Sequence, residues 1–227
     1  MSLRFSAIIT AAGSSQRFNM SSNSNVKKEF LSMGSSSVLG CAIKPFLEID
    51  GLVSLVVTYR EGELEKTRKL LSDIDYDIAF VQGGETRQKS VFNALKYLKE
   101  SKDDIDFVGI HDGARPFIIK DLIERCLETA EKVGGSCPCI RVTDTLVKVD
   151  EEGLLCSRIP REGVCTVQTP QVFRFPDIYF AHLNAKADKA YTDDTEIFMD
   201  AGGKVGFVQG DPDNRKITYA SDLREGL

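Results

Sequence analysis

Long hydrophobic runs and an excess of basic residues are both missing from this sequence of 227 residues. Its longest apolar stretches, such as Leu52–Val57, are far shorter than the roughly 20 residues that span a bilayer, which excludes a transmembrane segment. Met1–Ser6 lacks the long apolar core of a signal peptide. The formal net charge of −5 disfavours nucleic-acid binding, because proteins that neutralise phosphates usually carry a basic excess. We therefore expect a cytoplasmic protein with no membrane and no nucleic-acid partner.

Histidines and closely spaced cysteines are also scarce. His111 and His182 are the only histidines, which argues against a multi-histidine metal centre. The six cysteines are scattered, and the close pair Cys137 and Cys139 lacks the CxxC spacing of zinc or thioredoxin-like sites. We expect the cysteines to be reduced and mostly buried, as is usual in the cytoplasm.

What the chain does have is an alternation of apolar runs of strand length with helical patterns. The predicted strands are Phe5–Ile9, Leu52–Val57, Ile78–Val81, Phe107–His111, Ser136–Val142 and Lys204–Val208. The predicted helices are Val38–Ile49, Glu61–Leu71, Thr86–Leu98, Lys120–Val133, Pro176–Ala187 and Asp193–Ala201. This order, with continuous apolar strands, predicts an α/β fold in which helices flank both faces of a mostly parallel sheet. We assign residues 1–227 to a single domain.

The alternation breaks between residues 141 and 175. Residues 143–149 and 154–159, on either side of a turn at Asp150–Gly153, alternate in the manner of a β-hairpin. An isolated pair of strands is only marginally stable in water. We therefore expect a protruding arm that needs a partner, most simply a second copy of the chain.

The loop after the first strand is the first candidate for ligand binding, because ligands bind at the carboxyl ends of strands in open α/β sheets. Small residues followed by Gly13 let backbone amides approach an anion, and Ser14 and Ser15 add hydroxyl groups. Arg17 and Lys28 add positive charge suited to a polyphosphate. The alternative is a plain surface loop that contains one glycine. In either case, residues 13–25 are predicted to form a long polar loop. A GxGxxG fingerprint is not present, which disfavours a nicotinamide or flavin enzyme.

The second candidate loop, Gly83–Ser90, follows the third strand and opens a helix. It has Walker A spacing, but Gln88 replaces the glycine that lets such a loop wrap phosphates, so a P-loop is disfavoured. Its two glycines let a flat base or ribose lie close to the backbone, and Ser90 offers a hydroxyl. The alternative is a simple strand-to-helix turn with Thr86 as its N-cap.

Asp112 ends an apolar strand beside Gly113 and is the candidate metal ligand. A single carboxylate together with phosphate oxygens commonly holds Mg²⁺, and we favour this role over a carboxylate that only accepts hydrogen bonds from turn amides. His111 is expected to be a packed, hydrogen-bonded residue. Thr192 precedes acidic residues and is also a good helix N-cap, while Arg161 and Lys216, taken alone, are typical of solvated surface charges.

Taken in order, these segments resemble the 2-C-methyl-D-erythritol 4-phosphate cytidylyltransferases of the non-mevalonate isoprenoid pathway. The matching series, from Ala7 to Leu223, includes AAGSSQRF, KKEFL, GGETRQKSV, HDGARPF, DTL, QTPQVF, TDDTEIF and NRKIT. The resemblance implies a Rossmann-like nucleotidyltransferase fold, a Mg²⁺ requirement and a homodimer whose hairpin arms embrace. It also implies an enzyme that transfers CMP from CTP to 2-C-methyl-D-erythritol 4-phosphate and releases diphosphate.

The same resemblance implies a role for individual residues. Arg17 and Lys28 would be catalytic, by neutralising charge on the α-phosphate, and Asp112 would carry Mg²⁺. The nucleotide-binding set is Ala11, Ala12, Gly13, Ser14, Ser15, Gly84, Glu85, Ser90, Asp112 and Ala114, of which Gly84, Ser90 and Ala12 would read cytosine. The set that binds the sugar phosphate is Arg115, Thr145, Arg161, Thr169, Thr192 and Lys216. Arg161 and Lys216 would hold its phosphate, and Arg115 and Thr145 would act across the dimer interface.

The chain departs from the family pattern in two places. The polar loop Phe18–Lys27 is longer than usual, and we expect it to order when CTP binds. It leaves a choice between Lys27 and Lys28 as the catalytic lysine, and we choose Lys28 because the family's Glu-Phe-Leu follows it. Ser15 stands where the family usually has a second glycine.

Two alternative functions stay open from the sequence. A ribitol 5-phosphate cytidylyltransferase would share most of these motifs. A non-catalytic nucleotide-binding homologue is disfavoured, because a protein that only binds nucleotide has no need of cations around the α-phosphate.

Overall fold

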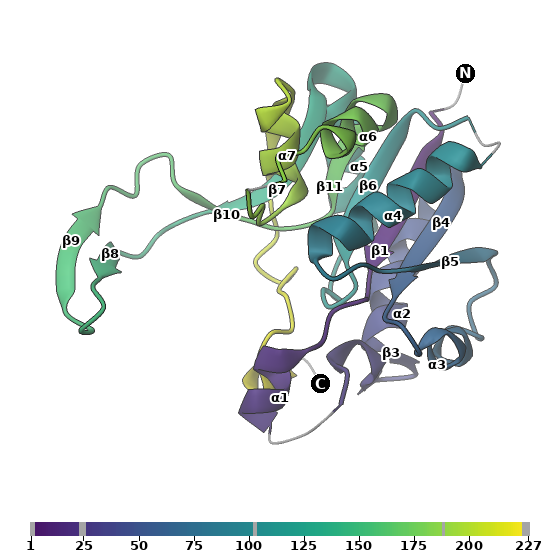
Figure 1. Cartoon of the computed structure of the whole chain (residues 1–227), viewed down its shortest axis with the longest axis horizontal. Helices are drawn as coiled ribbons and strands as arrows, with labels where there is room; N and C mark the ends of the chain where they lie inside the picture. Colours follow the sequence, from purple (N-terminus) through teal and green to yellow (C-terminus); the bar gives the residue numbers. More distant parts are fainter. Residues whose placement is uncertain (1–2, 23–25, 102–103, 188, 224–227) are drawn as a thin grey trace.

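An eight-stranded sheet forms the centre of the protein, as seen in a computed structural model that describes residues 3–22, 26–101, 104–187 and 189–223 (Figure 1). Its strands are β1 (Phe5–Thr10), β4 (Leu52–Tyr59), β5 (Ile78–Gln82), β6 (Phe107–Asp112), β7 (Gly134–Arg141), β10 (Cys165–Val167), β11 (Gln171–Arg174) and β12 (Lys204–Gln209). They run in the order β10-β7-β11-β6-β1-β4-β5, and β12 pairs with β7. β1 is parallel to both β4 and β6, β4 to β5, and β12 to β7. The prediction of a mostly parallel sheet is therefore confirmed.

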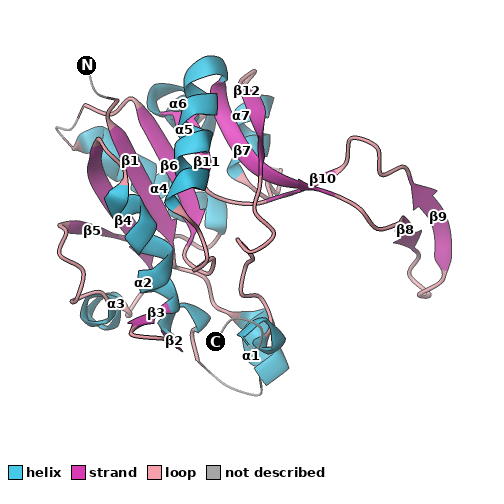
Figure 2. Ribbon diagram, turned by 180° about the vertical axis from the view of Figure 1, so that it is seen from behind, coloured by secondary structure: helices cyan, strands magenta, loops and turns pink. Residues whose placement is uncertain are grey.

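Helices cover both faces of this sheet (Figures 1 and 2). They are α2 (Val38–Ile43), α3 (Leu64–Leu70), α4 (Arg87–Glu100), α5 (Lys120–Val133), α6 (Phe175–Leu183) and α7 (Asp194–Asp200). Because successive strand residues point to opposite faces, β1 contributes to two cores. Ala7 and Ile9 pack with residues of α2 and α5, whereas Ile8 packs with residues of α4, α6 and α7. The continuous apolar strands of the sequence are thus explained by burial on both sides.

Several of the predicted boundaries are wrong: the helix predicted over Pro176–Ala187 ends at Leu183, and the one predicted over Glu61–Leu71 begins at Leu64. The loop expected from residue 13 to 25 contains a helix, α1 (Gln16–Ser22), because Phe18 is buried against Val38 and Ile217; residues 23–25 lie outside the described residues. The helix expected over Val38–Ile49 ends at Ile43, and the 3₁₀ helix η2 (Lys44–Glu48) follows. Pro45 lacks the amide hydrogen that would continue an α-helix at this point.

Two further strands were not predicted. β11 inserts between β6 and β7 and is antiparallel to both, and the short β10 is antiparallel to β7. The remaining short elements are the 3₁₀ helices η1 (Lys28–Phe30) and η3 (Ala220–Leu223) and the strand pair β2 (Ser32–Met33) and β3 (Ser36–Ser37).

The strands β8 (Leu146–Val149) and β9 (Leu155–Ile159) form a separate antiparallel sheet. This hairpin stands away from the rest of the molecule in Figures 1 and 2. The Asp150 carboxylate closes the turn by accepting from the amide of Leu154 at 2.8 Å. Within residues 146–159 no side chain is buried, and Leu154 and Leu155 are 61% and 73% exposed. The hairpin therefore has no hydrophobic core within its own chain.

The cysteines agree with the sequence only in part. All six are free, as expected, but only Cys126, Cys137 and Cys139 are buried, while Cys156 on the hairpin is exposed. Among the described residues, no helix has both the length and the apolar character needed to cross a membrane.

Candidate active site

A cavity of about 780 Å³ lies at the carboxyl ends of β1, β4, β5 and β6. This is within the range of volumes typical of small-molecule sites. Its lining includes these predicted nucleotide-site and catalytic residues: Ala12, Gly13, Ser14, Ser15, Arg17, Lys28, Gly84, Glu85, Ser90, Asp112 and Ala114. Lys216, predicted to hold the sugar phosphate, lines it as well. Thus segments far apart in the sequence meet at one edge of the sheet, where the fold class places ligands.

The first loop offers backbone that is open to a ligand. A Cβ added at Gly13 would meet nothing within 4 Å, so packing within the protein does not require glycine there. Ser15 adopts the left-handed conformation with φ 53°, which suits a glycine better than a serine. Its hydroxyl compensates by donating to Glu29 Oε2 at 3.1 Å and accepting from the Lys28 amide at 3.3 Å. Ser15 therefore ties the loop to the segment that carries Lys28.

Lys28 lies in the cavity wall and is only 8% exposed. Its Nζ donates to the Ile217 carbonyl at 2.6 Å. Burial lowers the pKa of Lys28, and the nearby positive charges of Lys216 and Arg17 lower it further, against the opposing effects of Glu29 and Asp112. Lys27, the other candidate, pairs with Glu63 and does not line the cavity.

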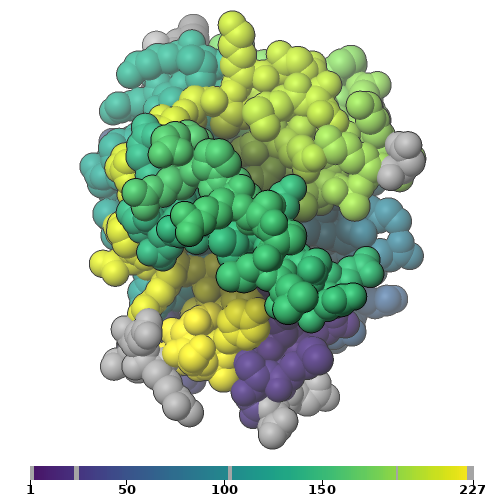
Figure 3. Space-filling view, turned by 90° about the vertical axis from the view of Figure 1, so that its left-hand side faces the viewer, coloured from purple at the N-terminus to yellow at the C-terminus, as the bar shows by residue number. Residues whose placement is uncertain are grey.

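The segment that follows Lys216 holds this corner together. Ile217 is fully buried against Phe18 and Val38, and its amide donates to the Ala114 carbonyl at 2.8 Å. Figure 3 shows the C-terminal segment (yellow) beside α1 (purple), and the Ala220 amide donates to Ser21 Oγ at 3.0 Å. The C-terminal segment thus fixes the position of α1, on which Arg17 lies.

The second loop makes a tight turn against the first. A Cβ on Gly83 would lie 2.3 Å from the Ala12 Cβ, and one on Gly84 would lie 2.5 Å from the Lys89 Cβ. Both positions therefore require glycine. The Gly84 amide donates to Ser90 Oγ at 3.0 Å, and Thr86 caps α4 by accepting from the Lys89 amide, as the alternative interpretation of this loop expected.

Asp112 is nearly buried and faces three cations. Its Oδ2 accepts from Lys216 Nζ at 2.7 Å and lies 3.6 Å from Arg115 Nε, and its Oδ1 lies 3.4 Å from Arg87 Nε. Burial alone would raise the pKa of Asp112, but these three cations hold it well below the usual range. The carboxylate is therefore ionised and directed into a cationic environment, which differs from the alternative role of accepting only from turn amides.

The residues around Asp112 fix its position. Its amide donates to Thr169 Oγ1 at 3.1 Å, and the same hydroxyl lies 2.9 Å from His111 Nδ1. His111 is fully buried and its Nε2 lies 3.1 Å from the Arg115 carbonyl, so the prediction of a packed, hydrogen-bonded histidine is confirmed. Burial lowers the pKa of His111 to about 4, which keeps the ring neutral near pH 7.

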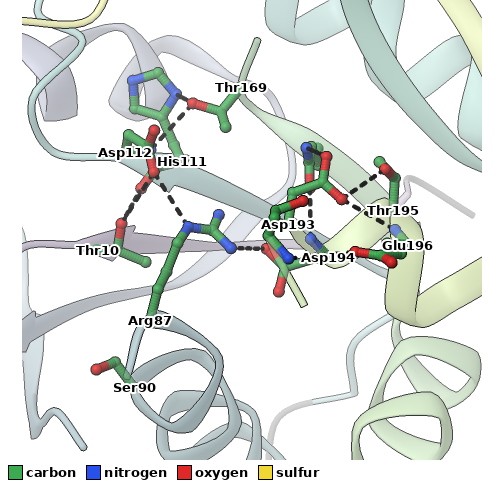
Figure 4. A network of polar contacts seen from close by, with 12 residues as sticks. Thr10, Arg87, Ser90, His111, Asp112, Thr169, Asp193, Asp194, Thr195 and Glu196 are labelled. Carbon is green, nitrogen blue, oxygen red and sulfur yellow. Dashed lines mark hydrogen bonds and ion pairs between the residues drawn. The ribbon is translucent and has the colours of Figure 1, made fainter. Parts of the chain in front are cut away.

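A second acidic group is linked to Asp112 through Arg87 (Figure 4). Arg87 Nη1 donates to Asp194 Oδ2 at 2.6 Å, and the other oxygen of Asp194 lies 3.1 Å from His182 Nε2. Helix α7 begins at Asp194, and its N-cap is Asp193 rather than Thr192, since the Asp193 side chain accepts from the Glu196 amide. Arg87 thus joins the start of α4 to the start of α7.

The other predicted residues lie outside this cavity. Ala11 is buried directly after β1, Thr169 is buried beneath Asp112, and Thr192 is exposed beside the cap of α7. Arg115 turns inward, where its Nη1 donates to the Asn214 carbonyl at 2.8 Å.

Thr145 and Arg161 are placed elsewhere, on the base of the hairpin. They line a smaller cavity of about 260 Å³ together with Arg158, Ile159, Pro160 and Glu162. In the described part of the chain, the two cavities share no lining residue. One chain therefore does not bring Arg161 and Lys216 into the same site.

Several lining residues were not predicted from the sequence as site residues: Thr10, Gln16, Phe18, Glu29, Arg60, Glu61, Gln82, Thr86, Arg87 and Thr218. Gly83, one of the two glycines of the second candidate loop, also lines the cavity. Arg60 and Glu61 follow β4 directly, so the rule that ligands bind at the carboxyl ends of strands could have found them. Arg87 lies inside a loop that was already a candidate, but no local pattern revealed its two carboxylate partners.

The donor set around Asp112 limits which metal could bind. Among the described residues there is no group of three or more His, Cys, Asp or Glu side chains that could hold a metal ion. A single carboxylate fits Mg²⁺, which keeps most of its waters and takes further oxygens from substrate phosphates. Asp112 can therefore share Mg²⁺ with a polyphosphate but cannot cage it.

Comparisons with known proteins show which family the chain resembles. The family model for 2-C-methyl-D-erythritol 4-phosphate cytidylyltransferase matches residues 5–226. The chain is 33% identical to the protein of that name from Thermosipho africanus over 95% of its own length and 93% of the relative's. It is 35% identical, over 97% of its length, to a bifunctional IspD/IspF enzyme from Chelativorans, of which it spans 53%. The crystal structure of 4-diphosphocytidyl-2C-methyl-D-erythritol synthase from Anaerococcus prevotii matches 99% of this chain and 94% of that chain with a TM-score of 0.82 and 26% identity.

Proposed function

The chain belongs to the 2-C-methyl-D-erythritol 4-phosphate cytidylyltransferase family, and on that premise we propose that the 780 Å³ cavity is its CTP site. The enzyme transfers CMP from CTP to 2-C-methyl-D-erythritol 4-phosphate in isoprenoid synthesis, and the relatives do not favour the ribitol 5-phosphate alternative. The observation that carries the proposal is the meeting of Arg17, Lys28 and Asp112 around one open loop. Such a cavity combines cations for phosphates with a carboxylate for the metal.

The reaction needs positively charged groups around the α-phosphate more than it needs a covalent intermediate with the enzyme. A phosphate oxygen of the sugar forms a bond to the α-phosphorus of CTP, while the bond from that phosphorus to the diphosphate oxygen breaks. Positioned cations supply most of the catalysis in such transfers. Lys28 has three N–H donors and gives one to the Ile217 carbonyl, so donors remain for the phosphate oxygens. Arg17 and Lys28 would thus stabilise the charge that develops at the α-phosphate.

The open backbone at Gly13 would let the phosphates lie close to the amides of the first loop. Next to it, Gly83 and Gly84 form a narrow turn against Ala12, with Ser90 at its end. Because packing against Ala12 and Lys89 holds this backbone in place, its amides and carbonyls can meet the edge of a base at fixed positions. We assign cytosine recognition to this turn.

Asp112 would carry Mg²⁺, which when bound neutralises charge on the phosphates. For the metal to reach Oδ2, Lys216 would give up its contact at 2.7 Å. Lys216 would then be available for the phosphate of the second substrate. Lys216 and the metal therefore compete for one oxygen in this account.

The sugar-phosphate site would be completed by a second copy of the chain. Arg161 and Thr145 line the hairpin cavity and are exposed, whereas Lys216 lines the main cavity. The hairpin also exposes Leu154 and Leu155, which need cover. We assign a homodimer in which each hairpin delivers Arg161 and Thr145 to the partner's cavity. A cytoplasmic location also stays a prediction from the sequence.

The substrate is tested by measuring CTP-dependent diphosphate release with each sugar phosphate in the presence of Mg²⁺. We expect a higher kcat/KM for 2-C-methyl-D-erythritol 4-phosphate than for ribitol 5-phosphate. A higher value for ribitol 5-phosphate would overturn the choice of substrate, and no release with either would favour a non-catalytic nucleotide-binding protein. A crystal soaked with CTP and Mg²⁺ tests the loop, the metal ligand and the base pocket together.

A further inference from the structure

We propose that Arg87 is a positioning residue that couples the nucleotide side of the active site to the sugar-phosphate side. This inference rests on the function proposed above. Arg87 lies in the motif GGETRQKSV and Asp194 in the motif TDDTEIF. Neither residue has a task in the proposed reaction. The structure brings these residues, which are 107 positions apart, into contact.

Arg87 occupies a junction between three elements. It is the first residue of α4, directly after the turn to which we assign cytosine recognition. Its Nε lies 3.4 Å from Asp112 Oδ1 at the end of β6, and its Nη1 donates to Asp194 Oδ2 at 2.6 Å at the start of α7. In Figure 4 the guanidinium lies between the two carboxylates. One planar group therefore sets the spacing between the proposed metal ligand and the Thr192–Asp194 segment.

The Asp194 end of this link is rigid. Asp194 is fully buried, and its second oxygen lies 3.1 Å from His182 Nε2. The His182 ring stacks on Phe92, which is on the same helix as Arg87. The Asp194 amide donates to Gln171 Oε1 at 3.1 Å, which ties the turn to β11. These contacts hold the Asp194 carboxylate to its surroundings, so a change in its contact with Arg87 acts on the start of α7 as a whole and not on one free side chain.

A guanidinium is required for this task. Two donors on different nitrogens of a planar fork can face two carboxylates at once, whereas the ammonium of lysine is a compact charge on a flexible stem. Burial would lower the pKa of Arg87, but Asp194 and Asp112 raise it, so the group is always charged. Binding of Mg²⁺ and CTP at Asp112 would therefore be felt at the Thr192–Asp194 segment, of which Thr192 is the residue that the family resemblance assigns to the sugar phosphate.

The test is thermodynamic coupling between the two ligands in Arg87→Lys. Affinity for 2-C-methyl-D-erythritol 4-phosphate is measured by calorimetry with and without Mg²⁺ and a CTP analogue that carries a methylene group between its α- and β-phosphorus. In the wild type we expect the analogue to tighten sugar-phosphate binding about tenfold, within the usual range of coupling between sites. In Arg87→Lys this factor should fall to about one, while affinity for the analogue alone changes less than about threefold. Arg125→Lys, on the exposed face of α5, is the matched control and should keep the coupling.

Asp194→Asn provides an independent arm, because it keeps the size of the side chain and removes its charge. It should lose the coupling as Arg87→Lys does, and the double variant should lose no more than either single variant. Coupling that persists in Arg87→Lys, or losses that add in the double variant, would overturn the inference, as would a wild type that binds both ligands independently. A wild type that binds neither ligand and releases no diphosphate would instead overturn the proposed function.

Discussion

The cavity at the sheet edge and the β8–β9 hairpin use the same kinds of side chain in opposite ways. In the cavity, Lys28 is buried against a carbonyl, and Asp112 is surrounded by three cations. On the hairpin, Arg161 is exposed, and its guanidinium contacts the backbone carbonyl of Thr143, on the other side of the hairpin base. Packing against the core therefore fixes the groups of the cavity, whereas little within the chain fixes those of the hairpin.

The comparison separates the part of the proposed active site that one chain forms alone from the part that it does not. A single chain supplies the lining residues of the cavity, its charged groups and its glycine turn. The hairpin exposes leucines and presents Arg161 and Thr145 away from that cavity. One half of the proposed active site is therefore preorganised within one chain, and in the dimer that we propose the other half would come from a second copy.

The largest effect is expected from Lys28→Ala. Removal of this cation should lower kcat by about a hundredfold or more, roughly 3 kcal/mol of transition-state stabilisation. Affinity for CTP should stay within about an order of magnitude of the wild type, because other groups hold the nucleotide. Steady-state kinetics and calorimetry measure the two quantities. Lys27→Ala, which removes the neighbouring lysine paired with Glu63, is the control and should have little effect on kcat. An unchanged kcat in Lys28→Ala would remove its catalytic role.

A smaller effect is expected from Arg161→Ala on the hairpin. The KM for the sugar phosphate should rise about tenfold, with little change in the KM for CTP, because a charged contact made in both the ground state and the transition state is lost. Lys148→Ala removes another exposed cation of the hairpin, one that does not line its cavity, and should leave both KM values unchanged. If the KM for the sugar phosphate did not move in Arg161→Ala, the hairpin would have no part in substrate binding.

The smallest effect concerns the stability of the cavity wall. Burial raises the pKa of Glu29, so the folded state binds this proton more tightly than the unfolded state. Ionisation of Glu29 therefore costs stability as the pH rises above the ordinary value of 4.5 and through its raised pKa. Glu29→Gln should unfold at a higher denaturant concentration than the wild type at pH 7, and the difference should vanish at pH 4.

The matched control for this prediction is Glu162→Gln, at the exposed base of the hairpin, which should follow the wild-type pH profile. A difference between Glu29→Gln and wild type that is the same at both pH values would show that burial of the charge is not the cause.

The sequence predicts most strands of the central sheet and the helices that flank it. The strands are apolar on both faces, and the helices have apolar residues at helical spacing. The sequence does not predict α1, whose formation depends on Phe18 packing against Ile217 from the far end of the chain. It also fails for β11, whose four residues pair between two strands that are not its neighbours in sequence.

The candidate site is predictable to the extent that its residues lie in recognisable loops. Gly13, Lys28, Ser90 and Asp112 follow strands or open helices, and the structure brings them to one cavity. Tertiary contacts such as Arg87 with Asp194 leave no local pattern. Arg161 and Thr145, which we propose to act in a partner's cavity, are recognised only by resemblance, because they line a cavity of the hairpin apart from the main one.

The most direct test of the account is to mix two defective variants, Lys28→Ala and Arg161→Ala, after dissociation and reassociation of the subunits. If each hairpin serves the partner's cavity, a mixed dimer contains one intact site, and about a quarter of all sites are restored at random pairing. We predict that the reassociated mixture has a kcat/KM for the sugar phosphate of about a quarter of the wild-type value, well above that of either variant alone. A mixture no more active than the average of its two components would show that Lys28 and Arg161 act within one chain, and would contradict the account.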